Sequence, residues 1–429
     1  MGDAGPFLVV SGRWDNIVSI VDLAAALDPA NNGTPAAIVA RVRVTPDIDA
    51  NGTGRLDTPA SGQPVSVAVA ADGRRAYVVN HSGLATPAAA AAFQHGHPGT
   101  VTVLDLAKAL DPATASTTKA VEAIVPTGTA GPVGIALTPD GRHLVVASAE
   151  AESCEDGGRR ITLINAGSLS VARQVLQRVV SHDGEGEPEP CPHPGPHPRF
   201  GRFPNANGVA VSPLGGGVIV SANGGTDDVS VIDLRAALAG EPGAEVARVP
   251  VETGPFGIAV SPDGRLAAVA SRENARTGAE GSTISLIDLQ RALDGAPDAE
   301  QARVRVGTDD PTQATRPFAV AFTPDGSRVL ASCFRSNTVS LVDVDAALAG
   351  APAEAKRLHL ATPDGRPGRP RGIVVTPDGR YAGVTGGAKE GQGSSVVFVL
   401  DIEAMRNAGC VTEVGNESYL LGLLPRRPS

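Results

Sequence analysis

The chain has 429 residues, of which 42% are hydrophobic, and its formal net charge is −10. This apolar content is too high for an intrinsically disordered chain. The acidic balance, without a block of Lys and Arg, excludes the basic footprint that nucleic-acid binding needs. No apolar run approaches the roughly 20 residues that cross a bilayer, so no membrane span is expected.

The N-terminal residues 1–6 have neither a basic region nor an apolar segment, so the sequence shows no signal peptide. We expect either a mature periplasmic or secreted protein, whose leader was replaced by Met, or a cytoplasmic protein. A disulfide between Cys154 and Cys191 would indicate an oxidising compartment, but their spacing alone leaves the pairing open.

An acidic loop follows the first two predicted strands, which cover residues 7–10 and 17–23. Asp47, Asp49 and Asn51 stand at the first, third and fifth positions of a calcium-loop pattern, and Asp57 lies one place before its twelfth position. The bidentate Glu and the flanking helices of that pattern are missing. A Ca²⁺ site and a metal-free turn are therefore both open.

One phrase then recurs along the chain at intervals of about 50 to 72 residues, the size of a four-stranded propeller blade with loop insertions. It consists of Pro, an apolar strand, and Ser/Thr-Pro-Asp-Gly-Arg. Variants of it begin near residues 64, 132, 206, 255, 317 and 370. Each copy predicts an inner strand, a tight turn in which Gly takes a positive φ, and a second apolar strand.

A third strand in each copy ends in Asp, usually followed by Leu, before a helical turn and a fourth strand. Because this Asp recurs, we interpret it as an N-cap and not as a catalytic group. The residues concerned are Asp22, Asp105, Asp233, Asp288, Asp343 and Asp401.

The seventh copy is divided between the two ends of the chain. Residues 7–45 lack an inner strand, and residues 418–429 supply one, with Gly422 placed in register with Gly372. The sequence therefore predicts an all-β fold, a seven-bladed β-propeller of four-stranded blades spanning residues 1–429 as one domain. Closing the ring in this way removes its open edges.

The repeated Ser-Pro-Asp-Gly-Arg and the phrase Val229-Ser-Val-Ile-Asp-Leu resemble the YVTN-type propeller repeats, and Tyr77-Val-Val-Asn80 is nearest to the tetrapeptide itself. That family includes lactonase-like propellers and the heavy chain of methylamine dehydrogenase. The resemblance covers nearly the whole chain and implies the architecture. It carries no catalytic motif that matches this sequence residue by residue.

Residues that occur in a single blade are candidates for function, because shared ones belong to the scaffold. They gather in loops expected on one face. The candidate catalytic residues there are His81, Glu150, Arg272 and Glu273. Several arginines would favour an anionic ligand. The candidate substrate-binding residues are Arg13, Trp14, Asn80, Arg202, Asn205, Asn223, Arg335 and Arg371.

Six of the eight histidines fall in two segments, in a pattern that would suit Zn or Cu. The alternative is solvated histidines in stiff, proline-rich loops. These six residues are His81, His95, His97, His182, His193 and His197. No P-loop or dinucleotide fingerprint is present, so we expect no nucleotide cofactor.

The family resemblance and the loop residues together favour an enzyme, hydrolase- or lactonase-like, which acts on a small anionic or lactone- or sugar-type substrate, with or without a divalent metal (Ca, Zn or Cu). Two alternatives stay open because fold alone does not decide function. One is a non-catalytic platform that binds a ligand or a protein partner. The other is a periplasmic metal-binding or redox-partner propeller.

Overall fold

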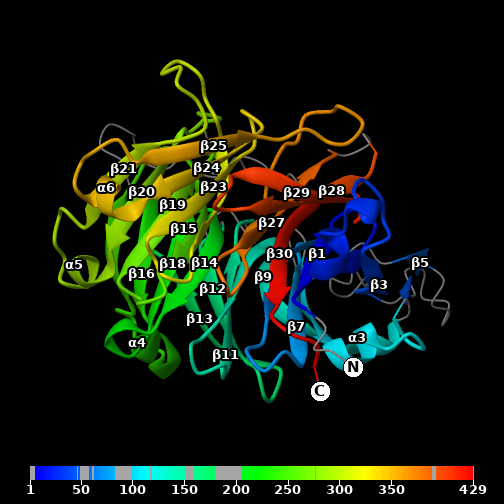
Figure 1. Cartoon of the computed structure of the whole chain (residues 1–429). Coiled ribbons are helices and arrows are strands. Elements are labelled where there is room, and N and C mark those ends of the chain that lie inside the picture. Colours follow the sequence, from blue (N-terminus) through cyan, green and yellow to red (C-terminus); the bar gives the residue numbers. More distant parts are fainter. Residues whose placement is uncertain are drawn as a thin grey trace.

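The computed structural model describes residues 5–45, 47–48, 58–59, 62–82, 98–115, 118–150, 158–178, 204–275, 277–388 and 393–428. These residues form seven four-stranded antiparallel sheets, together with one short two-stranded sheet of β4 (Asp47–Ile48) and β5 (Thr58–Pro59). The inner strands of consecutive sheets contact one another around a closed ring (Figure 1). The predicted seven-bladed β-propeller is confirmed.

Each blade is numbered here by its place in the chain, with its strands given from the inner one outward. Blades 1 to 3 are β6 (Pro64–Val69), β7 (Arg75–Asn80), β8 (Pro98–Asp105), β9 (Val121–Ala130); β10 (Pro132–Leu137), β11 (His143–Ser148), β12 (Arg160–Asn165), β13 (Ser170–Leu176); and β14 (Ala206–Ser212), β15 (Val218–Asn223), β16 (Asp228–Asp233), β17 (Glu245–Pro250).

The remaining four blades repeat the same order. They are β18 (Pro255–Val260), β19 (Leu266–Ser271), β20 (Thr283–Asp288), β21 (Glu300–Arg305); β22 (Pro317–Phe322), β23 (Arg328–Cys333), β24 (Thr338–Asp343), β25 (Glu354–His359); β26 (Ile373–Val375), β27 (Tyr381–Gly387), β28 (Ser395–Asp401), β29 (Arg406–Thr412); and β30 (Ser418–Leu424), β1 (Phe7–Gly12), β2 (Ile17–Asp22), β3 (Ile38–Arg43).

The recurring Asp at the end of the third strand caps a helical turn, as predicted. Its carboxylate accepts backbone N–H bonds at the start of five short helices, which satisfies donors that the helix itself leaves free. They are α1 (Leu23–Ala26), α3 (Leu106–Leu110), α4 (Leu234–Ala239), α5 (Leu289–Leu293) and α6 (Val344–Leu348). Asp401 accepts the N–H of Ala404 in a turn instead. Single 3₁₀ turns lie at η1 (Pro29–Asn31), η2 (Thr118–Ala120) and η3 (Leu214–Gly216).

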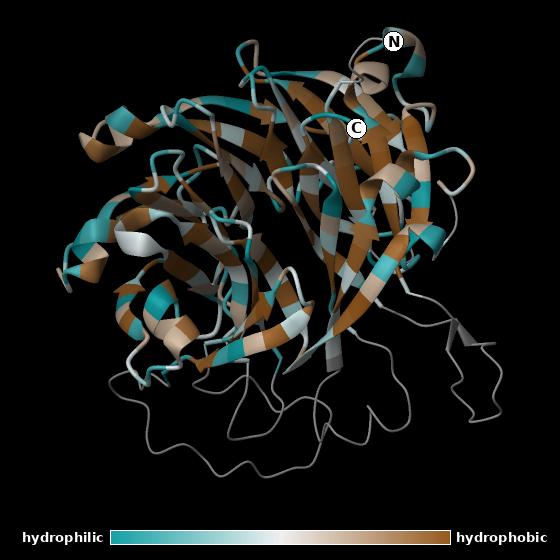
Figure 2. Ribbon diagram, turned by 90° about the horizontal axis from the view of Figure 1, so that it is seen from below, coloured by the Kyte–Doolittle hydropathy of each residue, from teal (hydrophilic) through white to brown (hydrophobic). Residues whose placement is uncertain are grey.

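The core lies between neighbouring blades. The second and third strands of each blade are almost entirely buried and mostly apolar, whereas the outer strands carry many partly and fully exposed side chains. Figure 2 shows the same division, with brown strands inside the ring and teal segments toward its outer surface. The fold thus buries apolar area over every blade-to-blade contact, so each blade depends on its neighbours.

The closing blade joins both ends of the chain. β30 pairs antiparallel with β1, and Figure 1 shows the two strands side by side. The prediction for closure is confirmed, but the predicted register is wrong by two residues. Gly12 pairs with Ser418, just as Ser271 pairs with Pro255, so Leu420 and not Gly422 is equivalent to Gly372.

Among the described residues, no helix has the length and apolar character needed to cross a membrane.

Candidate functional site

One end of the ring, here called the mouth, is where every inner strand begins. We define it by three positions in each blade: the residue before the inner strand, the second residue of that strand, and the first residue after the second strand. In six blades the registers make these positions equivalent, because the first residue of the inner strand pairs with the last residue of the second strand. In blade 6, where β26 begins only at Ile373, the first two positions are the residues on either side of Pro370 in the repeat, Arg369 and Arg371. The mouth is therefore built from residues far apart in the sequence.

The second residues of the inner strands form an apolar layer at the mouth. Phe256 and Phe318 have ring centroids 4.6 Å apart, and Phe318 meets Tyr419 edge-on at 5.4 Å. Val133, the second residue of the inner strand of blade 2, belongs to the same cluster of buried residues. The full set of second residues is Val65, Val133, Asn207, Phe256, Phe318, Arg371 and Tyr419.

Three arginines lie over the aromatic rings of this layer and its rim: Arg13, Arg272, and Arg371, whose guanidinium is 5.3 Å from the Phe334 ring centroid and 5.8 Å from that of Tyr419. The guanidinium of Arg272 is 5.0 Å from the Phe256 ring centroid and 4.9 Å from that of Phe318. Arg13 lies over Trp14 and Tyr419, at 4.9 and 5.3 Å. Such contacts attract a cation to the negative face of the ring without using its N–H donors.

The aromatic side chains of the cluster are drawn from a small supply. The chain has only nine Phe, three Tyr and one Trp. Five of these thirteen lie in the mouth cluster, and none of the five is shared by all blades. The rings concerned are Trp14, Phe256, Phe318, Phe334 and Tyr419.

Arg272 is the least satisfied of the mouth arginines. Its Nε is buried and has no hydrogen-bond partner among the described residues. Its one nearby carboxylate, Glu273, is 3.9 Å from Nη2, which is too long for a strong hydrogen bond. The side chain remains 25% exposed, so its N–H groups can bind an acceptor on a ligand that enters from solvent.

Arg371 is held very differently. Its side chain is only 1% exposed, and it donates hydrogen bonds to the carbonyls of Ser418 and Ala388, with the carboxylate of Glu417 3.7 Å away. Burial lowers the pKa of the Arg371 guanidinium, and Tyr419, Glu417, Arg272 and Arg369 modify it from nearby. We interpret Arg371 as a fixed positive charge beneath the mouth rather than a group that contacts ligand directly.

An ion-pair network of two arginines and two glutamates lies on the rim between blades 4 and 5. Arg316 Nη2 donates a hydrogen bond to Glu273 at 2.7 Å and forms an ion pair with Glu280 at 2.7 Å. Arg335 Nη1 donates to the same Glu280 at 2.8 Å. Glu273 is thereby committed to an arginine, which limits it as a proton acceptor.

His81 and Glu150 meet across the boundary between blades 1 and 2. The Nε2 of His81 is 3.0 Å from Glu150 Oε1, and its Nδ1 is 3.3 Å from the carbonyl oxygen of Pro132. Both ring nitrogens face acceptors, so only the imidazolium donates to both. The two predicted catalytic residues are therefore neighbours.

The mouth has an excess of positive charge on an acidic chain. Its three positions per blade hold five arginines (Arg13, Arg272, Arg316, Arg369 and Arg371) and a single glutamate, Glu417. The side chains that bind these residues add the carboxylates of Glu150, Glu273, Glu280 and Asp227, and Arg335 pairs with Glu280. Six arginines against five carboxylates, before His81 is counted, contrast with the net charge of −10 for the whole chain. This contrast favours anions at the mouth.

Two predicted binding residues do not reach the mouth surface. Asn80 and Asn223 are the last residues of their strands, and both side chains are fully buried. Asn80 donates to the hydroxyls of Thr100 and Thr102. Asn205, by contrast, does lie at the mouth, and its side chain donates to the carbonyl of Ala149 in the preceding blade at 2.6 Å.

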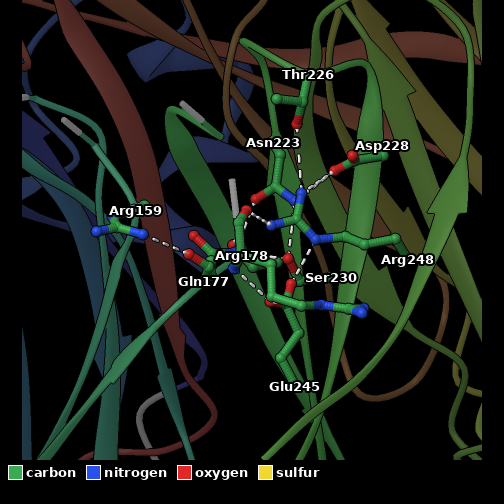
Figure 3. A network of polar contacts seen from close by, with 10 residues as sticks. Arg159, Gln177, Arg178, Asn223, Thr226, Asp228, Ser230, Glu245 and Arg248 are labelled. Atoms are coloured by element: carbon green, nitrogen blue, oxygen red, sulfur yellow. Dashed lines mark hydrogen bonds and ion pairs between the residues drawn. The ribbon is translucent and has the colours of Figure 1, made fainter. Parts of the chain in front are cut away.

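Asn223 belongs to a buried polar network between blades 2 and 3 (Figure 3). It donates to Asp228 and Ser230, and Gln177 donates to Asn223 and Ser230. Arg248 binds Asp228 at 2.7 Å and also contacts Glu245. Burial raises the pKa of Asp228, which nearby Arg248 opposes. This network links the end of β13 to the next blade and is structural.

Several predicted ligands lie outside the described residues. These are Arg202, His95, His97, His182, His193, His197, Asp49, Asn51 and Asp57, and the same holds for both cysteines of the suggested disulfide. Asp47 is described only as the first residue of β4. Within the described part of the chain, no group of three or more His, Cys, Asp or Glu is arranged to hold a metal ion.

Two surface grooves lie away from the mouth and occupy equivalent places in successive blades. One, of about 430 Å³, is lined by β21 and the turn before β25, and the other, of about 460 Å³, by β17 and the turn before β21. Because the same gap recurs, it follows from the repeat, and we assign no site to it.

Sequence reasoning missed the aromatic layer and the residues that precede the inner strands. The usable signal was the position after the repeated Pro, which changes from Val to Phe to Arg between blades. The prediction compared whole loops and did not compare this single position.

Comparison with solved structures agrees with the fold. The periplasmic gluconolactonase of Pseudomonas aeruginosa superposes with a TM-score of 0.61 at 18% identity, over 97% of this chain and 99% of its own. A Bacteroides fragilis protein assigned as a 6-phosphogluconolactonase gives 0.61 at 15%, over 98% of both chains. Hydrazine synthase of Kuenenia stuttgartiensis gives 0.56 at 16%, over 94% of this chain and 96% of that one.

No family model and no curated protein matches the chain. The YVTN resemblance therefore remains a resemblance. At these identities the similar structures establish the propeller architecture but not the activity, which depends on the residues of the mouth.

Proposed function

We propose that the mouth binds a small anionic ligand of sugar or lactone type and that the protein is a lactonase-like hydrolase. The observation that carries the proposal is Arg272: a half-buried guanidinium, held by two aromatic rings, whose N–H donors have no good acceptor among the described residues. A guanidinium pairs with carboxylate or phosphate through two parallel hydrogen bonds. The aromatic layer beside it suits the apolar face of a sugar-like ring.

Hydrolysis of a lactone needs a base for the attacking water and positive charge near the carbonyl oxygen as it becomes anionic. Arg272 supplies the charge. Glu150 is the better placed carboxylate for the base, because the imidazole of His81 lies 3.0 Å from it and can exchange a proton with it, whereas the Glu273 carboxylate accepts a hydrogen bond from Arg316. His81 orients Glu150 and is able to return a proton to the leaving oxygen.

The similar structures support this proposal without deciding it. Two of them carry lactonase names, and one of those proteins is named as periplasmic, which agrees with the location expected for this chain. A divalent metal held by the histidine segments or by the Asp47 loop remains a separate proposal. Metal analysis of the purified protein tests it.

The hydrolase proposal is tested with Arg272→Ala. We expect wild-type protein to hydrolyse glucono-δ-lactone or 6-phosphogluconolactone, and the variant to lose roughly 100-fold or more in kcat/KM, as when one charge-stabilising donor is removed. The matched control is Arg406→Ala, an exposed arginine on an outer strand that pairs with Asp401. Its activity should equal that of the wild type. Equal activity of all three proteins would rule out Arg272 as a functional group.

A binding platform without catalysis is the second candidate, and one observation favours it. Among the described residues, each glutamate at the mouth already has a donor: Glu150 has His81, Glu273 has Arg316, Glu280 has Arg335, and Glu417 has Trp14. None of these four carboxylates is then free to act as a base for water. This candidate predicts that the wild type binds the anionic product with an Arg272-dependent affinity and shows no turnover of either lactone.

A further inference from the structure

The residue immediately before six of the inner strands has a left-handed backbone, and so does Arg369, which precedes Pro370 of the repeat in blade 6, where β26 begins only at Ile373. The seven φ values lie between +41° and +63°. We call these residues the left-handed ring; they are Gln63, Gly131, Asn205, Gly254, Arg316, Arg369 and Glu417. The ring surrounds the mouth, because each member precedes the strand that supplies the aromatic layer.

Five members of the left-handed ring are not glycine, which is unfavourable for an L-residue. A Cβ in this region approaches the following carbonyl oxygen, so glycine meets the backbone requirement best. Three of the five, Gln63, Arg316 and Arg369, also precede proline, which favours an extended conformation in the residue before it. Backbone geometry alone would therefore select glycine in every blade.

The two glycines of the ring are explained by crowding. A Cβ on Gly131 would lie 2.3 Å from the Glu150 side chain, and one on Gly254 would lie 1.9 Å from the backbone of Glu273. In these blades the side chain of Glu150 and the backbone of Glu273 occupy the space that a side chain at the left-handed position would take.

The other ring side chains hold mouth residues of neighbouring blades. Gln63 Oε1 accepts two hydrogen bonds from Arg13, at 3.1 and 3.2 Å. Glu417 accepts a bond of 2.5 Å from the Trp14 indole. Arg316 donates to Glu273. Each non-glycine member so described contacts a charged or aromatic group that the ligand would meet.

We infer that three members of the left-handed ring, Gln63, Arg316 and Glu417, are positioning residues, whose side chains fix recognition groups of the mouth at positions where glycine would make the backbone more stable. This inference rests on the proposed anion site. It predicts that backbone strain and ligand recognition can be changed separately. A glycine at one of these positions removes the backbone strain, but the mouth residue that the original side chain contacted loses its hydrogen bond.

The test is Gln63→Gly, because Gln63 is only partly buried and, among the described residues, its side chain forms hydrogen bonds with Arg13 alone. We expect a melting temperature equal to or above that of the wild type, and an affinity for 6-phosphogluconate about tenfold weaker, since Arg13 loses its support. Gln63→Glu keeps an acceptor for Arg13 and should restore the affinity. The matched control is Glu413→Gly, an exposed left-handed residue after the outer strand β29, which should leave affinity unchanged.

A second readout separates failure of this inference from failure of the anion site. Trp14 is the only tryptophan, and Arg13 lies over its ring, so quenching of its fluorescence by iodide, relative to neutral acrylamide, reports the charge held there. Gln63→Gly should lower this ratio even if no sugar acid binds the wild type. The inference is overturned if the variant melts clearly below the wild type, or if its quenching ratio is the wild-type one.

Discussion

Arg272 and Arg371 show how two arginines of one cluster take different roles. Both lie over aromatic rings, but Arg371 is fully buried with carbonyl acceptors, whereas Arg272 is partly exposed with an unpaired Nε. A buried charge that keeps its partners supports the fold, and removing it leaves those partners unsatisfied. The sequence predicted both as site residues, because it locates a residue in a loop and does not reveal burial.

The role of Arg371 is tested by Arg371→Ala. We expect the free energy of unfolding to fall by about 3–5 kcal/mol, the usual effect of breaking a buried ion pair, because Glu417 and two carbonyls lose their donor. Arg406→Ala, which breaks an exposed pair, should change it by less than about 1 kcal/mol. Urea unfolding followed by circular dichroism measures both. Similar small losses would show that Arg371 is not a structural charge.

Because loop position does not reveal burial, the other predicted site residues also had different outcomes. His81 and Glu150 were proposed from loop positions, and the structure brings them within 3.0 Å. Asn80 and Asn223 were proposed on equal grounds, yet each is the last buried residue of its strand. One residue along an alternating strand decides whether a side chain faces the core or the solvent.

At the scale of elements, the turns between the first two strands of each blade were predicted well because their chemistry is local. In Asp140, Asp263 and Asp325, a hydrogen bond from the Thr or Ser two residues earlier lowers the pKa of the carboxyl group. The carboxylate also accepts the backbone N–H two residues later. Such turns need only the residues that form them.

These lowered pKa values predict a pH-dependent stability. A carboxyl group whose pKa is lower in the folded state favours folding when ionised, so its contribution is complete above the unfolded value of about 3.9 and is lost as the pH falls through the folded pKa. The combined Asp140→Asn, Asp263→Asn and Asp325→Asn variant should be less stable than the wild type at pH 7. The difference should shrink as the pH falls below about 3.9 and through the lowered folded-state pKa values. Urea midpoints across this range measure it, and a difference independent of pH would contradict the assignment.

The register of β30 was predicted incorrectly for a physical reason. Side chains of a strand alternate between its faces, so a shift of two residues preserves which ones face the core. Gly422 suggested alignment with Gly372, but the pairing with β1 places Leu420 there. This correction brings Tyr419 into the aromatic layer and Glu417 into the left-handed ring.

For the whole molecule, the number of blades followed from the repeat alone, because six copies and one divided copy close a ring. The mouth did not follow, since it depends on side chains from blades that lie far apart in the sequence. Arg13 and Trp14 at one end of the chain meet Glu417 and Tyr419 at the other. Ring closure and the site are therefore built by the same residues.

Deletion of residues 418–429 tests this dependence. The truncated protein lacks β30, which leaves β1 unpaired on its inner edge and removes Tyr419 from the mouth. We expect a melting temperature far below that of the full chain and a tendency to aggregate through the exposed edge. A truncated protein that melts like the full-length one would show that closure is wrongly assigned.

The central claim is that the mouth of this acidic propeller is an anion site centred on Arg272. Calorimetric titration of 6-phosphogluconate into wild type and Arg272→Ala, at low and at high salt, tests it most directly. We predict binding by the wild type that weakens as salt rises, because exposed charges are screened, and affinity at least tenfold weaker in the variant. Equal affinity of the two proteins, or no binding by the wild type at low salt, would contradict the claim.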